Sequence, residues 1–189
     1  MVDDHAFVAG CDAKLHIVNL KNGKSTGAVD IEGPTGVTPT VKGEHVYFGT
    51  EGGTFYAVNW KEQEIQWEQQ PGDRVSSFRS SPAVTDSIAI VGSRGKRIFG
   101  INLADGETKW QFVTKRNVDS SPIIVGNRAI VGSDEGRLYM LNAENGEKVW
   151  EYELGGTLGA SPAFADGKLV IGSDDGTVYC FGTKKDVGR

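Results

Sequence analysis

Two acidic turns are the first candidates for chemistry in this sequence, because both follow the pattern Ser-Asp-acid-Gly. Residues 133–136 have the sequence SDEG, and residues 173–176 have the sequence SDDG. Carboxylate oxygens suit Ca²⁺, but a loop site needs about six or more oxygen ligands at fixed spacing. Each segment supplies two carboxylates, so we expect tight turns here rather than calcium sites.

The histidines, serines and cysteines lack the companions that metal binding or nucleophilic catalysis requires. No Cys or carboxylate accompanies His5, His16 or His45 in an arrangement typical of metal ligands. Serines precede three of the prolines, without a Gly-x-Ser-x-Gly elbow. Cys11 and Cys180 lie near opposite ends of the chain and form no Cys-x-x-Cys motif. The sequence therefore predicts no catalytic residue, no metal ligand and no cofactor-binding residue.

A repeat of about 40 residues organises the chain, and three kinds of residue recur with it. The prolines are Pro39, Pro82, Pro122 and Pro162, with spacings of 43, 40 and 40 residues. Ten residues after each proline stands a glycine, namely Gly49, Gly92, Gly132 and Gly172. The tryptophans Trp67, Trp110 and Trp150 each follow an asparagine by eight residues, and these are Asn59, Asn102 and Asn142. A fixed period of this length is typical of repeat architectures.

Each repeat contains four short segments in which apolar and polar residues alternate, which predicts β-strands. In the third repeat the predicted strands are Ser81 to Val84, Ser87 to Val91, Arg97 to Leu103 and Thr108 to Val113. Glycine-containing turns join the strands, and no segment has the pattern of an amphipathic helix. We therefore predict an all-β fold, a β-propeller of four-stranded antiparallel blades.

Two segments carry a more specific signature. GINLADGETKW (Gly100 to Trp110) and MLNAENGEKVW (Met140 to Trp150) resemble the tryptophan-docking repeat of quinoprotein dehydrogenases and related PQQ-repeat propellers. The resemblance implies that Trp67, Trp110 and Trp150 pack between blades, and that Asn59, Asn102, Asn142, Gly106 and Gly146 hold the adjoining backbone. The copy AVNWKEQEIQW lacks the glycine, and IVNLKNGKSTG has Gly27 in place of tryptophan. Trp60 lies outside the series and is expected at an exposed strand turn.

The strand count predicts an incomplete ring of about 4.5 blades. Eighteen strands are predicted, whereas four blades need 16 and five need 20. The predicted repeat units are 1–36, 37–79, 80–119, 120–159 and 160–182, which form one arc over residues 1–182, followed by a tail at 183–189. We expect this arc to belong to a larger ring. Because an open arc exposes strand edges and half of a blade interface, the isolated chain should self-associate.

A group of basic residues is the candidate partner-binding sector. The turn SRGKR in the third repeat contains Arg94, Lys96 and Arg97, where later repeats carry acidic residues. Arg74, Arg79, Lys115 and Arg116 lie in the connections on either side. Since these turns and connections share one face of a propeller, the seven cations should cluster and bind an acidic segment of a protein or an anionic ligand. Alternatively, they are solvated turn charges.

Composition and charge disfavour some classes of function for this chain. The chain has 189 residues, 20 basic and 25 acidic, with a net charge of −5, which disfavours general nucleic-acid binding. No apolar run approaches a membrane-spanning length. The first residues lack the features of a secretory signal, which leaves the compartment open, with a periplasmic or extracytoplasmic parent protein expected.

We expect a non-catalytic scaffold for protein–protein interaction, similar to the propeller lipoprotein of the outer-membrane β-barrel assembly machinery, the BamB-like branch of the superfamily. One alternative is a fragment of a quinone- and calcium-dependent alcohol or sugar dehydrogenase, which would bring pyrroloquinoline quinone and Ca²⁺ as cofactors. That resemblance also implies an adjacent Cys-Cys pair, which this chain does not have. Another alternative is the extracytoplasmic sensor propeller of a kinase.

Overall fold

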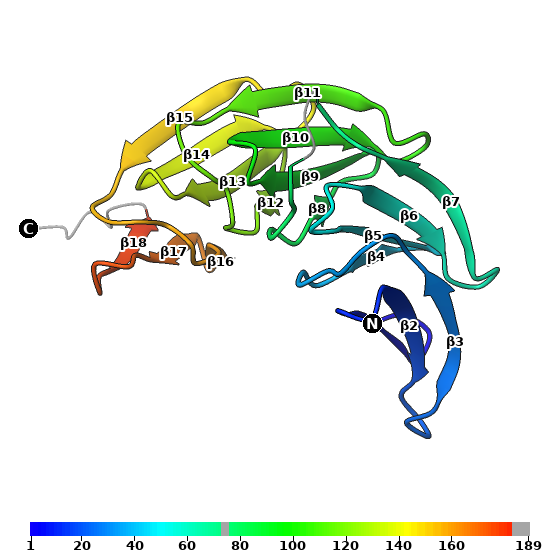
Figure 1. Ribbon diagram of the computed structural model, residues 1–189. Helices are drawn as coiled ribbons and strands as arrows, with labels where there is room; N and C mark the ends of the chain where they lie inside the picture. The colour runs from blue at the N-terminus through cyan, green and yellow to red at the C-terminus, as the bar shows by residue number, and fades with distance from the viewer. Residues whose placement is uncertain (73–75, 183–189) are drawn as a thin grey trace, which may run out of the picture.

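The computed structural model describes residues 1–72 and 76–182, and this part of the chain consists of antiparallel β-sheets joined by turns (Figure 1). Eighteen strands form five sheets, which we call blades 1 to 5 in chain order. Among the described residues, no helix has the length and apolar character needed to span a membrane. The predicted all-β architecture is confirmed.

The blades differ in their number of described strands. Blade 1 contains β1 (His5–Ala9), β2 (Lys14–Asn19) and β3 (Ser25–Asp30). Blade 2 contains β4 (Thr40–Lys42), β5 (His45–Gly49), β6 (Phe55–Asn59) and β7 (Glu64–Gln69). Blade 3 contains β8 (Ala83–Val84), β9 (Ile88–Ser93), β10 (Arg97–Asn102) and β11 (Thr108–Val113). Blade 4 contains β12 (Ile123–Val125), β13 (Arg128–Ser133), β14 (Arg137–Asn142) and β15 (Lys148–Glu153). Blade 5 contains β16 (Ala163–Ala165), β17 (Lys168–Gly172) and β18 (Val178–Gly182).

The blades follow one another around an open arc (Figure 1). Strands β3, β7, β11 and β15 follow its outer curve, whereas β4, β8, β12 and β16 lie toward the inside. Neighbouring innermost strands contact one another. A chain of hydrogen bonds runs along this inner side: the backbone N–H of Thr38 donates to Ser81 Oγ at 2.9 Å, that of Ser81 to Ser121 Oγ at 2.9 Å, and that of Ser121 to Ser161 Oγ at 3.0 Å. The pre-proline serines therefore link blades, which is a structural use of their hydroxyl groups.

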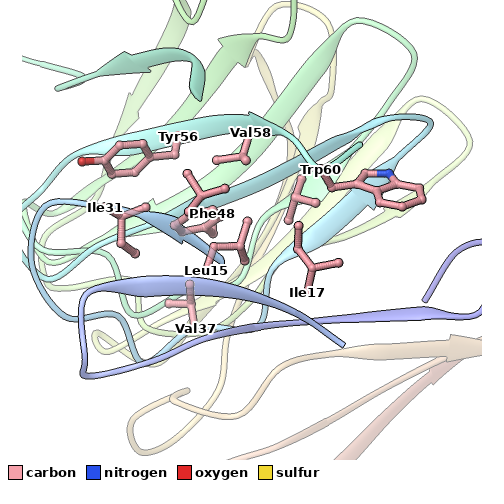
Figure 2. Packing of buried hydrophobic residues seen from close by; sticks show 10 residues of the cluster. Leu15, Ile17, Ile31, Val37, Phe48, Tyr56, Val58 and Trp60 are labelled. Atoms are coloured by element: carbon pink, nitrogen blue, oxygen red, sulfur yellow. The ribbon is translucent and has the colours of Figure 1, made fainter. Parts of the chain in front are cut away.

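The hydrophobic core is divided into four clusters, each lying between two adjacent blades. Between blades 1 and 2, Leu15 and Ile17 pack against Phe48, Tyr56 and Val58 (Figure 2). Equivalent clusters lie between blades 2 and 3, 3 and 4, and 4 and 5. Each interior blade thus buries both faces of its sheet, which explains the nearly continuous apolar character of strands such as β6 and β9.

Candidate interaction surface on the loop face

The turns between second and third strands meet the connections between blades on one face, which we call the loop face. It consists of turns 50–54, 93–97, 133–137 and 173–177, with connections 31–39, 70–72, 76–82, 114–122 and 154–162. Backbone hydrogen bonds join the two sets: Arg94 N donates to Ser77 O at 3.0 Å, and Asp134 N donates to Asn117 O at 2.9 Å. Six of the seven predicted cations belong to segments of this face, and Arg74 lies outside the described residues.

Two of the basic residues are engaged by carboxylates. Arg94 donates to Asp119 through both Nε and Nη2, with the Nη2–Oδ2 distance at 2.6 Å. The carboxylate of Asp119 thereby raises the pKa of Arg94. Arg79 forms an ion pair with Glu51 at 3.2 Å. These pairs neutralise charge that a count from the sequence treats as available to a partner.

Arg97 is also withdrawn from the surface. Its side chain is half-buried, and Nη1 donates to the carbonyl of Gly95 at 3.2 Å. With Ser76, Arg94 and Lys96, it lines an open hollow of about 320 Å³. Arg97 therefore contributes to the shape of this turn as well as to its charge.

Of the six described cations in the predicted basic sector, three are exposed and form no ion pair with another described residue: Lys96, Lys115 and Arg116. We call them the cation corner. The backbone N–H of Thr114 donates to Lys96 O at 3.0 Å, so the turn of blade 3 is tied to the connection that carries the other two. The fold thus brings together residues about 20 positions apart in the chain.

An acidic group in blade 4 adjoins the cation corner. Glu135 Oε1 accepts hydrogen bonds from Tyr139 OH at 2.5 Å and from the backbone N–H of Lys115 at 3.3 Å. The pKa of Tyr139 is raised mainly by burial and secondly by this hydrogen bond. The pKa of Asp134 is raised mainly by burial and secondly by the negative charge of Asp119. The loop face therefore changes from positive to negative between blade 3 and blade 4.

The carboxylate–aromatic pair of blade 4, Glu135 and Tyr139, has counterparts in blades 1 and 5 that were not predicted from the sequence. Tyr179 OH donates to Asp175 Oδ2 at 3.3 Å, and His16 Nε2 lies 2.7 Å from Asp12 Oδ2. His16 therefore has one carboxylate partner that was not identified from the sequence, although among the described residues this pair is not part of a group that could hold a metal ion. The available signal was an acidic residue four positions before the aromatic one.

The tryptophans dock onto the next blade through their indole N–H groups. Trp67 Nε1 donates to Leu103 O at 2.9 Å, and Trp110 Nε1 donates to Ala143 O at 3.1 Å. Trp150 is half-buried and forms ring contacts with Tyr152 and Phe181. These contacts place the tryptophan series between blades.

The asparagines and glycines of the same series shape the turns that receive the indoles. Asn102 Oδ1 accepts from the backbone N–H of Ala104 at 3.3 Å, and the Asn59 and Asn142 side chains accept from the residues two positions after them. Gly106 and Gly146 have positive φ of 77° and 72°. A Cβ atom at Gly106 would lie 2.6 Å from Cε3 of Trp67, so the indole leaves no room for a side chain.

The junction between blades 1 and 2 uses a different arrangement. Gly27 stands where the indole would be, and the side chain of Gln63 occupies the space over it. Trp60 is buried and packs against Phe7 and His5 of blade 1, with ring centroids 5.5 and 5.1 Å away. The expectation of an exposed Trp60 was wrong, because this indole fills the junction from the opposite blade.

The described residues do not fit a quinone and calcium site. Cys11 and Cys180 are both exposed and belong to opposite ends of the arc, so they cannot supply the adjacent pair that the dehydrogenase resemblance implies. Within residues 1–72 and 76–182, no three His, Cys, Asp or Glu side chains gather in a way that could hold a metal ion. No step of a quinone reaction can be assigned to these residues.

One protein-family model matches nearly the whole chain. The family model described as outer membrane protein assembly factor BamB matches residues 1–123 and 113–186. The chain belongs to the BamB family. No curated protein matches it significantly in sequence.

Two solved structures share the BamB-family fold of this chain. The crystal structure of BamB from Moraxella catarrhalis matches with a TM-score of 0.84 and 20% identity, over 96% of this chain and 56% of that one. The computationally designed Ika8 protein matches with a TM-score of 0.81 and 14% identity, over 97% of this chain and 57% of that one. The chain therefore spans little more than half the length of either protein.

Proposed function

We propose that this BamB-family chain is a non-catalytic scaffold that binds other proteins during outer-membrane protein assembly. The family match supports the assembly role, because its description is that of an outer membrane protein assembly factor. The feature of this chain that carries the binding proposal is the cation corner, where Lys96, Lys115 and Arg116 are exposed and lack ion pairs within the described residues. Unpaired surface charges steer and orient partners of opposite charge. The proposed partner segment is acidic.

Reversing two charges of the cation corner tests the acidic-partner proposal. In K96E/K115E, attraction becomes repulsion at both positions, and we expect affinity for a fluorescently labelled glutamate-rich peptide to fall about tenfold, equivalent to about 1.4 kcal/mol. Binding of the native chain should also weaken as ionic strength rises, because exposed charges are screened. Fluorescence anisotropy at two salt concentrations measures both effects.

The matched control is K24E/K109E, which changes the net charge by the same amount. Lys24 and Lys109 are exposed, but they lie away from the loop face, in the β2–β3 turn and in β11. We expect this control to bind the peptide nearly as well as the native chain. Equal losses in both variants would show that only net charge matters, and unchanged binding by K96E/K115E would remove the corner from the partner surface.

The assembly role needs a separate cellular test. In a bacterium that lacks its own BamB-family protein, this chain is produced with an export signal, and folded outer-membrane β-barrel proteins are quantified. Partial recovery of those proteins supports the proposal. No recovery from a stable, exported chain contradicts the assembly role without affecting the peptide result.

A further inference from the structure

We propose that chains of residues 1–189 associate head to tail, with the free face of blade 5 in one copy packing on the free face of blade 1 in the next. The trailing face is the side of blade 5 directed away from blade 4. The leading face is the side of blade 1 directed away from blade 2. Each is one half of the blade interface that the molecule already contains four times.

The trailing face exposes a position that every interior junction buries. Val178 in β18 corresponds by repeat spacing to residues that pack against the following blade and are all fully buried, namely Leu15, Phe55, Ile98 and Leu138. Val178 itself is 71% exposed. Val170 and Cys180 on the same face are also exposed. Blade 5 thus presents small apolar side chains in the arrangement that elsewhere receives another blade.

The leading face shows the complementary pattern. Val8 in β1 corresponds to residues that pack against the preceding blade and are at most 1% exposed, namely Phe48, Val91, Val131 and Ile171. Val8 is 52% exposed, whereas Leu15 and Ile17, which face blade 2, are buried. The two ends of the arc therefore carry opposite halves of one type of interface, on sheets at opposite ends of Figure 1.

A second copy is the occupant that these observations favour, because the partner surface for each face already exists in the chain. Trailing and leading faces pack together at every interior junction, while one of each is left uncovered at the ends. Such a contact is heterologous: it uses two different patches, so repetition yields a ring or an open filament. The side chains at the free faces are smaller than most of their interior counterparts, so we expect a weaker contact than within the chain.

The test uses one charge on each face. V8D places a carboxylate on the leading face and V178E places one on the trailing face, where burial of an unpaired charge opposes association. Sedimentation velocity over a wide concentration range should show oligomers for the native chain and monomers for each variant alone. A 1:1 mixture of the variants retains one intact leading face and one intact trailing face, so it should form a dimer and nothing larger.

The control is V113D, which changes a residue that is 65% exposed on β11, away from both free faces. It should associate like the native chain, and circular dichroism should show the same β-sheet content for all variants. A native chain that stays monomeric throughout would overturn the proposal. A V8D chain that still dimerises would show trailing-to-trailing contact instead, and a mixture that stays monomeric would equally exclude the head-to-tail arrangement.

Discussion

At the scale of single residues, the blade junctions depend on a glycine that makes room for an indole. The ring of Trp110 lies over Gly146, where a Cβ atom would approach Cε3 to 2.5 Å. Where Gly27 replaces the indole, Gln63 stands in place of the glycine and still has a positive φ of 59°. Because a non-glycine residue holds the same turn conformation there, the indole's volume is the stronger reason for glycine at the docked turns.

Substituting Gly146 by alanine tests this explanation. G146A places a non-glycine residue in a left-handed backbone conformation and also makes its Cβ atom clash with Trp110. We therefore expect a greater loss of unfolding free energy in G146A than in G126A. Gly126 has φ of 59°, but a Cβ atom there would meet nothing within 4 Å. The difference should be about 1–3 kcal/mol, the usual cost of overpacking. Urea denaturation measures it, and equal losses would show that φ alone determines the residue type.

The tryptophan series could be predicted from the sequence, but the contacts between distant residues could not. Trp60 fills its junction by packing against Phe7 and His5. These residues lie more than 50 positions earlier in the chain, so no local sequence pattern indicates the contact. Arg94 appears as an available cation in the sequence, but Asp119 reaches it through the connection to blade 4. Charge counts locate a basic segment, whereas only the fold shows which of its charges are already paired.

At the scale of strands, a β-bulge orients each docking position. The register between the last two strands of blades 1 to 4 shifts between Ile17 and Val18, Ala57 and Val58, Gly100 and Ile101, and Met140 and Leu141. In blade 3, Trp110 pairs with Gly100 and Thr108 with Ile101, so Lys109 is the extra residue. A bulge increases the local twist and redirects the side chains beside it.

Deleting Lys109 tests the role of the bulge. Removing one residue restores simple alternation and sends either Trp110 or the residues before it to the wrong side of the strand. We expect a loss of about 3–5 kcal/mol, comparable to truncating a buried tryptophan. K109A should cost less than about 0.5 kcal/mol, because Lys109 is an exposed surface residue. Denaturation midpoints and tryptophan fluorescence measure both variants, and a deletion as mild as K109A would refute the role.

The strands themselves were largely predictable, because alternation marks them directly. The predicted strand Thr108 to Val113 matches β11, and Arg97 to Leu103 exceeds β10 by one residue. The predicted Ser81 to Val84 shortens to β8, since Pro82 has no N–H to donate. The bulges could not be predicted from the sequence, because their extra residues share no chemical property. Examples are Gln66, Lys109 and Val149.

At the scale of the whole molecule, stability should vary along the arc. Each described blade buries its apolar surface against its immediate neighbours, as in other repeat proteins. Interior blades have two such neighbours and blade 5 has one within the described chain, which leaves Val170 and Val178 exposed. Local opening costs less free energy where fewer apolar contacts are lost.

Hydrogen exchange measured by mass spectrometry should therefore protect blade 3 more strongly than blade 5. At low chain concentration, peptides covering β17 and β18 should exchange well before those covering β9 and β10. Head-to-tail association would bury the trailing face, so protection of β17 and β18 should rise with concentration in the native chain but not in V178E. Uniform protection along the arc would contradict the nearest-neighbour account of stability. A concentration-dependent rise that persists in V178E would instead place the association surface elsewhere on the molecule.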